Sequence, residues 1–246
     1  TLYQQGCAKA RLPNVEDDGW KGAVAINTSG GLTGGDRLTI AVDWRAGARA
    51  LVAGQAAEKI YRASSGVARV RTRLTLESGA QAEWLPQETI LFDRAALDRD
   101  TIVALMPDSR FLGVEAVVLG REAMGEAVRQ GSLRDAWRIN RGGKLVYADV
   151  VAMEGDIAGR LARTAIAGGA HAFASILHVA PEAERMLEAV RAATDGLEDA
   201  QAGASAWDGM LAVRVLARDG EALLAAVRRA LEPLRDGRAL PRVWKC

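Results

Sequence analysis

The first 157 residues alternate between apolar and polar side chains, and this alternation constrains the fold more than any other feature of the chain. It is clearest in Arg37–Asp43, Val67–Leu76 and Phe111–Leu119. Successive side chains of a β-strand point to opposite faces, so a period of two is typical of strands with one buried and one hydrated face. Glycine-containing turns separate these runs. We therefore predict an extended antiparallel β-region over residues 1–157.

Helical patterns begin only in residues 158–246. Apolar residues recur at helical spacing after Pro181 and again after Gly220, and both segments have acidic first turns, which suit the helix dipole. Residues 171–179 read as a strand, and residues 201–217 as a hairpin. The sequence thus predicts a mainly β, elongated fold with two α-helices in its C-terminal third. Because no linker separates the two regions, we expect the strand-helix-strand-strand-helix region to share a core with the β-rich one.

Composition excludes several classes of function. The chain has 246 residues, with 32 basic and 31 acidic side chains and no long block of either sign. Neither nucleic acid nor an anionic membrane surface is therefore an expected partner. The chain has no apolar run of about 18 residues that could span a bilayer, and its two cysteines, Cys7 and Cys246, lack a CxxC partner. We expect a cytoplasmic protein with two free thiols.

A glycine-rich run stands between two predicted strands. Residues 27–36 contain four glycines in six positions and end on Asp36. The spacing of Gly30 and Gly35 matches the glycines of a phosphate-binding loop, but Asp36 and Arg37 follow where Lys and Ser or Thr would hold phosphate and magnesium. A strand also follows, so no helix N-terminus can meet an anion. The run therefore predicts a tight turn between strands rather than a nucleotide site.

The chain offers little for nucleophilic catalysis. It has only two histidines, His171 and His178, whose odd separation places them on opposite faces of a regular strand, and it has no GxSxG motif. Carboxylates in apolar or turn-rich surroundings are more informative, namely Asp36, Glu58, Glu88 and Glu115. Each could pair with a basic side chain or lie on a hydrated face. Together they could instead be oxygen ligands for a divalent cation, or the paired acids of a hydrolase or transferase.

Five segments in order along almost the whole chain resemble the urease accessory protein UreD family, called UreH in some bacteria. They are residues 27–36 (NTSGGLTGGD), 55–62 (QAAEKIYR), 84–90 (WLPQETI), 119–126 (LGREAMGE) and 240–244 (LPRVW). The resemblance implies a non-catalytic maturation factor that acts with UreF and, through UreF, with the GTPase UreG to deliver nickel to apo-urease. It also implies a largely β fold with two helices and an internal water-filled passage proposed for nickel.

The same resemblance assigns a transit role to the four carboxylates. Asp36, Glu58, Glu88 and Glu115 become expected ligands for nickel in passage, with no tightly bound cofactor. Nickel(II) binds nitrogen and sulfur more strongly than carboxylate oxygen, so a transit route should avoid clusters of His and Cys that would retain it. A protein that only docks the partners together would have the same sequence features, and this alternative stays open.

Overall fold

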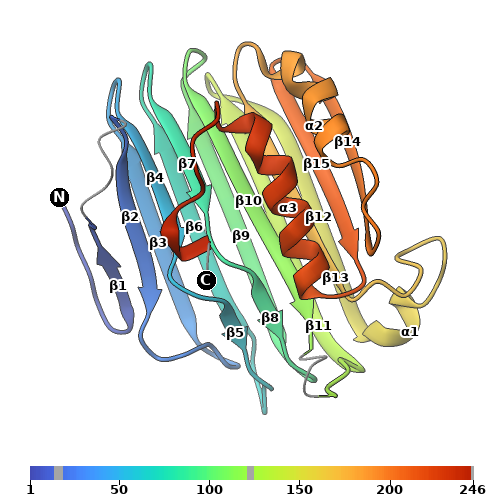
Figure 1. Ribbon diagram of the computed structural model, residues 1–246. Helices are drawn as coiled ribbons and strands as arrows, with labels where there is room; N and C mark the ends of the chain where they lie inside the picture. The colour runs from blue at the N-terminus through green and yellow to red at the C-terminus, as the bar shows by residue number, and fades with distance from the viewer. Residues whose placement is uncertain (14–18, 121–124, 245–246) are drawn as a thin grey trace.

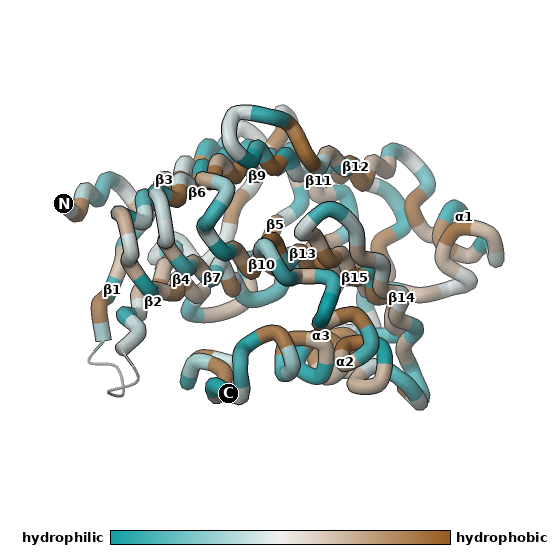
Figure 2. The backbone as a smooth tube through the Cα atoms, turned by 90° about the horizontal axis from the view of Figure 1, so that it is seen from above, coloured by the Kyte–Doolittle hydropathy of each residue, from teal (hydrophilic) through white to brown (hydrophobic). Residues whose placement is uncertain are grey.

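The computed structural model describes residues 1–13, 19–120 and 125–244, which form two β-sheets packed face to face, with the two longer helices on the outer face of the larger sheet (Figures 1 and 2). The larger sheet has ten strands: β1 (Ala8–Arg11), β2 (Lys21–Asn27), β4 (Arg49–Gly54), β5 (Glu58–Ile60), β7 (Gln81–Leu85), β8 (Thr89–Leu91), β10 (Arg110–Leu119), β13 (Ala172–Val179), β14 (Ala200–Trp207) and β15 (Met210–Ala217). The smaller sheet has five: β3 (Arg37–Trp44), β6 (Ala68–Leu76), β9 (Ala96–Leu105), β11 (Gln130–Arg141) and β12 (Lys144–Asp156).

From β2 to β11 the chain passes back and forth between the two sheets, whereas β11–β12 and β14–β15 are hairpins within one sheet, and the second is the hairpin predicted for residues 201–217. Tight turns at residues 45–48, 77–80 and 106–109 lead from β3 to β4, from β6 to β7 and from β9 to β10. These turns stack on one another through backbone hydrogen bonds, such as Gly47 N to Ser78 O at 2.9 Å and Arg110 N to Ala80 O at 2.9 Å. Backbone N–H and C=O groups of one turn therefore find hydrogen-bond partners in the next turn of the stack.

This path corrects the expected antiparallel pairing. Because each turn changes sheet, the neighbour of a strand within its own sheet arrives one circuit later and runs in the same direction. The pairs along β2-β4-β7-β10 and along β3-β6-β9-β11 are accordingly parallel. Antiparallel pairing holds at β1–β2, β11–β12, β10–β13, β13–β15 and β14–β15. The mainly β class is confirmed.

Two longer helices lie in the C-terminal part, as predicted. They are α2 (Leu187–Ala193), preceded by the 3-10 turn η2 (Ala183–Met186), and α3 (Gly220–Leu234), which cover the outer face of the larger sheet (Figures 1 and 2). Asp219 begins α3 by accepting a hydrogen bond from Ala222 N at 2.8 Å. The structure adds a short helix, α1 (Ile157–Leu161), and the turn η3 (Arg242–Trp244). A helix of five residues is too short to produce the periodicity by which the others were predicted.

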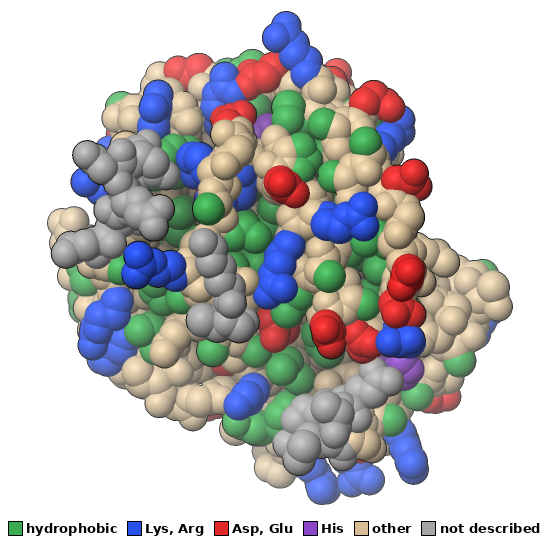
Figure 3. Space-filling model, viewed as in Figure 1, with side chains coloured by type: hydrophobic (Ala, Val, Ile, Leu, Met, Phe, Trp, Pro, Cys, Tyr) green, Lys and Arg blue, Asp and Glu red, His purple; other side chains and the backbone are tan. Residues whose placement is uncertain are grey.

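Apolar side chains pack in both interfaces between these three layers. Trp44, Leu74, Trp84 and Trp137 are buried between the sheets, and the apolar face of α3 packs against the larger sheet. On the face that carries the helices, acidic and basic side chains are both present, with apolar ones between them (Figure 3). Across residues 1–13, 19–120 and 125–244, no helix has the length and apolarity needed to cross a membrane. Cys7 is a free thiol, and Cys246 lies outside the described residues.

The glycine-rich run connects β2 to β3 and presses against a neighbouring segment. Leu32 N donates to Lys59 O at 2.8 Å, and Tyr61 N donates to Leu32 O at 2.7 Å. A Cβ at Gly34 would lie 2.0 Å from Ser65 O and 2.9 Å from Ala63 Cβ. The glycine at this position is therefore required by a close approach of two backbones.

Gly34→Ala should accordingly destabilise the protein, by roughly 1–3 kcal/mol, because the added methyl group meets backbone that cannot easily move. Gly203→Ala is the matched control, since a Cβ there meets nothing within 4 Å. It should leave the free energy of unfolding unchanged or raise it by up to about 1 kcal/mol. Urea unfolding followed by circular dichroism measures both. Equal effects of the two substitutions would contradict the close-approach explanation.

Candidate functional site

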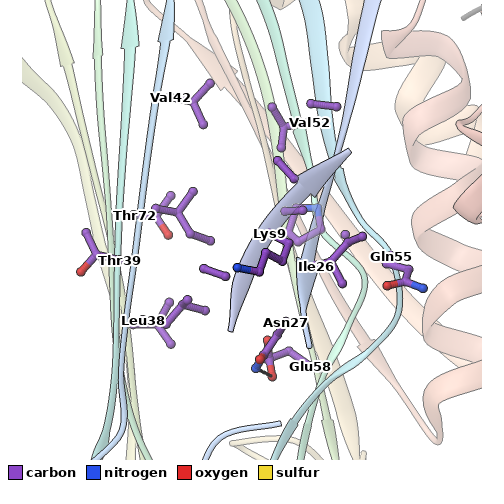
Figure 4. A pocket seen from close by; sticks show the side chains of 18 of the residues that line it. Lys9, Ile26, Asn27, Leu38, Thr39, Val42, Val52, Gln55, Glu58 and Thr72 are labelled. Carbon is purple, nitrogen blue, oxygen red and sulfur yellow. Dashed lines mark hydrogen bonds between the residues drawn. The ribbon is translucent and has the colours of Figure 1, made fainter. Parts of the chain in front are cut away.

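A cavity of about 680 Å³ lies between the two sheets, near the end where β1, β2 and β3 meet. Figure 4 shows Leu38, Val42 and Thr72 of the smaller sheet approaching from one side, and Ile26 and Val52 of the larger sheet from the other. Most of the wall is apolar, and charged and polar groups converge on one part of it. An apolar cavity of this size with a few convergent polar groups is the typical form of a binding site.

The guanidinium of Arg99 is a buried charged group of the cavity lining, and the residue is 5% exposed. Arg99 lies on β9, opposite Asp135 of the neighbouring strand β11. Its Nε donates to Asp135 Oδ1 at 2.9 Å and its Nη2 to Asp135 Oδ2 at 2.6 Å. This two-point contact joins two strands of the smaller sheet and fixes the plane of the guanidinium.

The remaining nitrogen of Arg99 reaches across to the larger sheet. Nη1 lies 2.7 Å from Glu115 Oε2 on β10 and donates to Thr89 Oγ1 on β8 at 2.8 Å. The other oxygen of Glu115 accepts a hydrogen bond from the indole of Trp84 at 3.3 Å. Arg99 therefore binds one carboxylate of its own sheet by two bonds and one carboxylate of the facing sheet by a single contact.

Glu58 adds a further carboxylate to the cavity wall. It is half-buried on β5 and accepts a hydrogen bond from Asn27 Nδ2 at 3.0 Å (Figure 4). Burial raises the pKa of Glu58, while the bond from Asn27 and the charge of Arg99 lower it; the net direction is upward. Glu58 and Arg99 thus interact electrostatically. Arg99 interacts with three carboxylates, two of which line the cavity, so this cluster has an excess of acidic groups.

The buried carboxyl of Glu115 responds to this excess. Burial raises its pKa, Arg99 lowers it and Asp135 raises it again, for a value of about 7. Burial lowers the pKa of Arg99, but Asp135 and Glu115 together raise it by more than burial lowers it. The guanidinium therefore stays charged. Near neutral pH the cluster therefore exchanges a proton at Glu115 while its positive charge is fixed.

The structure brings two of the four predicted carboxylates, Glu58 and Glu115, into one cavity, and places Asp36 and Glu88 outside its lining. Asp36 is exposed, and its Oδ2 closes the turn before β3 by accepting from Thr33 N at 2.8 Å. Glu88 is half-buried and supports the site through its backbone, because its carbonyl accepts from Glu58 N at 2.9 Å. A bond within the turn accounts for the carboxylate of Asp36 without a bound cation.

Arg99 and Asp135 are functional-site residues that were not predicted from the sequence. Both lie on the buried face of their strands. Arg99 shares that face with Leu97 and Val103, and Asp135 shares it with Leu133 and Trp137. A charged residue at an apolar position of a period-two strand is a readable signal of a buried charge that needs a partner. It was obscured because both strands also carry charges on the hydrated face.

The described ranges, 1–13, 19–120 and 125–244, contain no group of three or more His, Cys, Asp or Glu side chains placed to hold a metal ion. Neither His nor Cys occurs among the described residues that line the cavity. What the arrangement offers is a pair of carboxylates, Glu58 and Glu115, with a fixed positive charge beside them. Such a pair can engage a cation only weakly, because the chain does not complete a coordination shell.

Comparison with known proteins decides the family. The model of the family described as UreD urease accessory protein matches residues 1–245. The chain belongs to this family. The urease accessory protein UreD of Rhizobium leguminosarum bv. viciae is 50% identical over 243 residues, which cover 99% of this chain and 88% of that protein. The UreD proteins of Agrobacterium fabrum, 46% identical over 99% of this chain and 84% of theirs, and of Azorhizobium caulinodans, 46% identical over 89% and 80%, are similar.

The raised pKa of Glu115 predicts a specific pH dependence of stability. The folded form binds the proton of Glu115 more tightly than the unfolded chain, so its contribution is full below pH 4.5 and is lost as the pH rises to about 7. Relative to Glu115→Gln, the free energy of unfolding of the unmodified protein should therefore fall across this interval.

Urea unfolding of both proteins at several pH values from 4.5 to 8 measures the difference. The depressed pKa of His178, about 4, changes stability in the opposite direction as the pH falls below 6.5, but it affects both proteins equally and cancels in the comparison. A stability difference that stays constant with pH would show that Glu115 titrates as an ordinary carboxyl.

Proposed function

We propose that this protein is a maturation factor for urease that gives nickel a route toward the apo-urease active site. Membership of the UreD family supports the role in urease maturation. The observation that supports the route is the inter-sheet cavity, which Glu58 and Glu115 both line and in which both interact with Arg99. Nickel is cargo in this proposal, not a resident cofactor.

The chemistry of the cavity wall suits transfer better than storage. Its acidic groups provide oxygen ligands, and its described lining contains no His or Cys. Because nickel(II) prefers nitrogen and sulfur donors, oxygen donors and water release it more readily. Glu58 on β5 and Glu115 on β10 line the same cavity from one sheet, with β8 between their strands, and would let a hydrated cation exchange water for carboxylate oxygen one ligand at a time.

The partners in this proposal are UreF, the GTPase UreG acting through UreF, and apo-urease, with maturation taking place in the cytoplasm. The resemblance of the chain to its family motivates these assignments. The glycine-rich run is consistent with these assignments. It lacks the Lys-Ser/Thr of a phosphate-binding loop, and Gly34 within it lies close against backbone atoms of a neighbouring segment. Nucleotide hydrolysis would then be supplied by UreG.

An enzymatic role of the same carboxylates fits the geometry less well. A hydrolase or transferase needs a carboxyl group that can exchange a proton with its substrate. The oxygens of Glu115 are instead engaged by Arg99 and by the indole of Trp84. Proton transfer between Glu115 and a substrate would require one of these contacts to break first, which makes an enzymatic role the second candidate.

Glu58→Gln and Glu115→Gln should each lower urease activation severalfold while the complex with the partners still assembles. The substitution removes a charged oxygen ligand and approximately retains the size and shape of the side chain. Asp36→Asn and Glu88→Gln are matched controls outside the cavity lining and should activate normally. Co-expression with urease and the other accessory proteins, followed by complex composition, urease activity and nickel content, measures all four.

The same experiment separates transport from docking. Full activation by both cavity variants within intact complexes would mean that the protein only brings its partners together. Purified complexes that never contain UreF would count against the proposed maturation role as a whole.

A further inference from the structure

Arg99 is the one buried basic side chain among the described residues that line the cavity. Lys59 and Arg45 are exposed and Lys9 is half-buried, so water screens their charges. Arg99 is 5% exposed and contacts the same carboxylate, Glu115, that a passing cation would use. A guanidinium does not release its proton in a protein, so its charge competes with any other cation at every physiological pH.

The two carboxylates around Arg99 hold it unequally. Asp135 binds it through two hydrogen bonds to Nε and Nη2, the planar geometry that best fixes a guanidinium. Glu115 is reached by Nη1 alone, and Nη1 also donates to Thr89. Arg99 and Asp135 lie on adjacent strands of one sheet, whereas Glu115 lies on the facing sheet. Loss of the Glu115 contact would therefore leave Arg99 fixed by Asp135 and Thr89.

From this asymmetry we infer that Arg99 is an internal counter-cation that sets how weakly the passage binds a divalent metal. A metal ion that engages Glu115 and Glu58 displaces the Arg99–Glu115 contact, and Asp135 retains the guanidinium beside the site. As the metal ion leaves, Arg99 neutralises Glu115 again. This inference rests on the proposed passage and assigns to it a residue that determines affinity.

A buried acidic pair without such a competitor would retain a divalent cation. Carboxylates taken out of water attract a cation more strongly than exposed ones, because the surroundings screen less. Placing a fixed positive charge beside them reduces this attraction and supplies the charge balance when the metal ion is absent. The arrangement thus permits a low-dielectric passage that neither excludes nor traps its cargo.

The test compares Ni²⁺ affinities of the 246-residue chain and its variants, with Ni²⁺ alone as the probe in a competition titration against a chromogenic chelator. Arg99→Gln combined with Asp135→Asn removes the competing charge together with its partner, so neither of their strands is left with an unpaired buried charge at this position. This double variant should bind Ni²⁺ roughly tenfold more tightly, as expected for the loss of one nearby charge. Adding Glu115→Gln to it should abolish the gain.

Two further comparisons control for general effects of charge and folding. Arg138→Gln with Asp100→Asn removes an ion pair from the same strands, β9 and β11, outside the cavity lining, and should leave the affinity unchanged. Asp135→Asn alone frees Arg99 from its second carboxylate and should weaken Ni²⁺ binding severalfold, because Arg99 then competes for Glu115 more strongly. Thermal unfolding confirms that each variant is folded.

The outcomes distinguish this inference from the function it rests on. If Glu58→Gln and Glu115→Gln weaken Ni²⁺ binding but the double variant at Arg99 and Asp135 does not strengthen it, the role of Arg99 is refuted and the passage stands. If no substitution in the cavity changes Ni²⁺ binding, both are refuted. Should the double variant fail to fold, an unchanged affinity in Asp135→Asn alone would overturn the inference.

Discussion

The contacts of Arg99 with Glu115 and Asp135 are the interaction on which the interior of this protein depends. Moving ionised side chains from water into a protein costs several kcal/mol each, and the cost is offset only by good geometry and further hydrogen bonds. Here the guanidinium reaches both sheets, and Thr89 and Trp84 satisfy remaining donors and acceptors. The same cluster that holds the two sheets at a defined separation also leaves the acidic part of the cavity wall beside it.

The path of the chain makes this cluster possible. Arg99 and Glu115 come from consecutive strands, β9 and β10, which lie in different sheets because the turn at residues 106–109 crosses between them. The parallel register of β9 and β11 then sets Asp135 opposite Arg99. Stacked turns support one end of these strands through backbone hydrogen bonds. The position of each charged group therefore follows from backbone pairing, and side-chain geometry only completes it.

Much of the fold could be predicted from local pattern. Alternation predicts strands such as Arg37–Asp43, which the structure forms as β3. Apolar residues at helical spacing, with acidic first turns, predict the helices after Pro181 and Gly220. Strand direction could not be predicted, because period two is the same for a hairpin and for a turn that changes sheet. Parallel neighbours depend on contacts between residues about one circuit apart, which no local window contains.

The candidate site was predictable to a similar extent. Glu58 and Glu115 were recognisable as carboxylates in unusual surroundings, but nothing local separated them from Asp36 and Glu88, which the fold places outside the cavity lining. Arg99 was hidden among charges of the hydrated face of β9, where Asp98 and Asp100 pair with arginines of neighbouring strands. Whether a charge is buried depends on the other sheet, and the sequence of one strand does not contain that information.

The central claim is that cargo moves through the cavity between the sheets, and it can be tested without altering any charge. Ala25 lies on the cavity wall, so Ala25→Trp narrows the space while leaving Glu58, Arg99 and Glu115 in place. The decisive measurement is the nickel content of urease purified after co-expression with this variant, with complex assembly verified in parallel. The account predicts urease with markedly less nickel from intact complexes. A full complement of nickel in urease matured by an assembled, cavity-filled variant would contradict it.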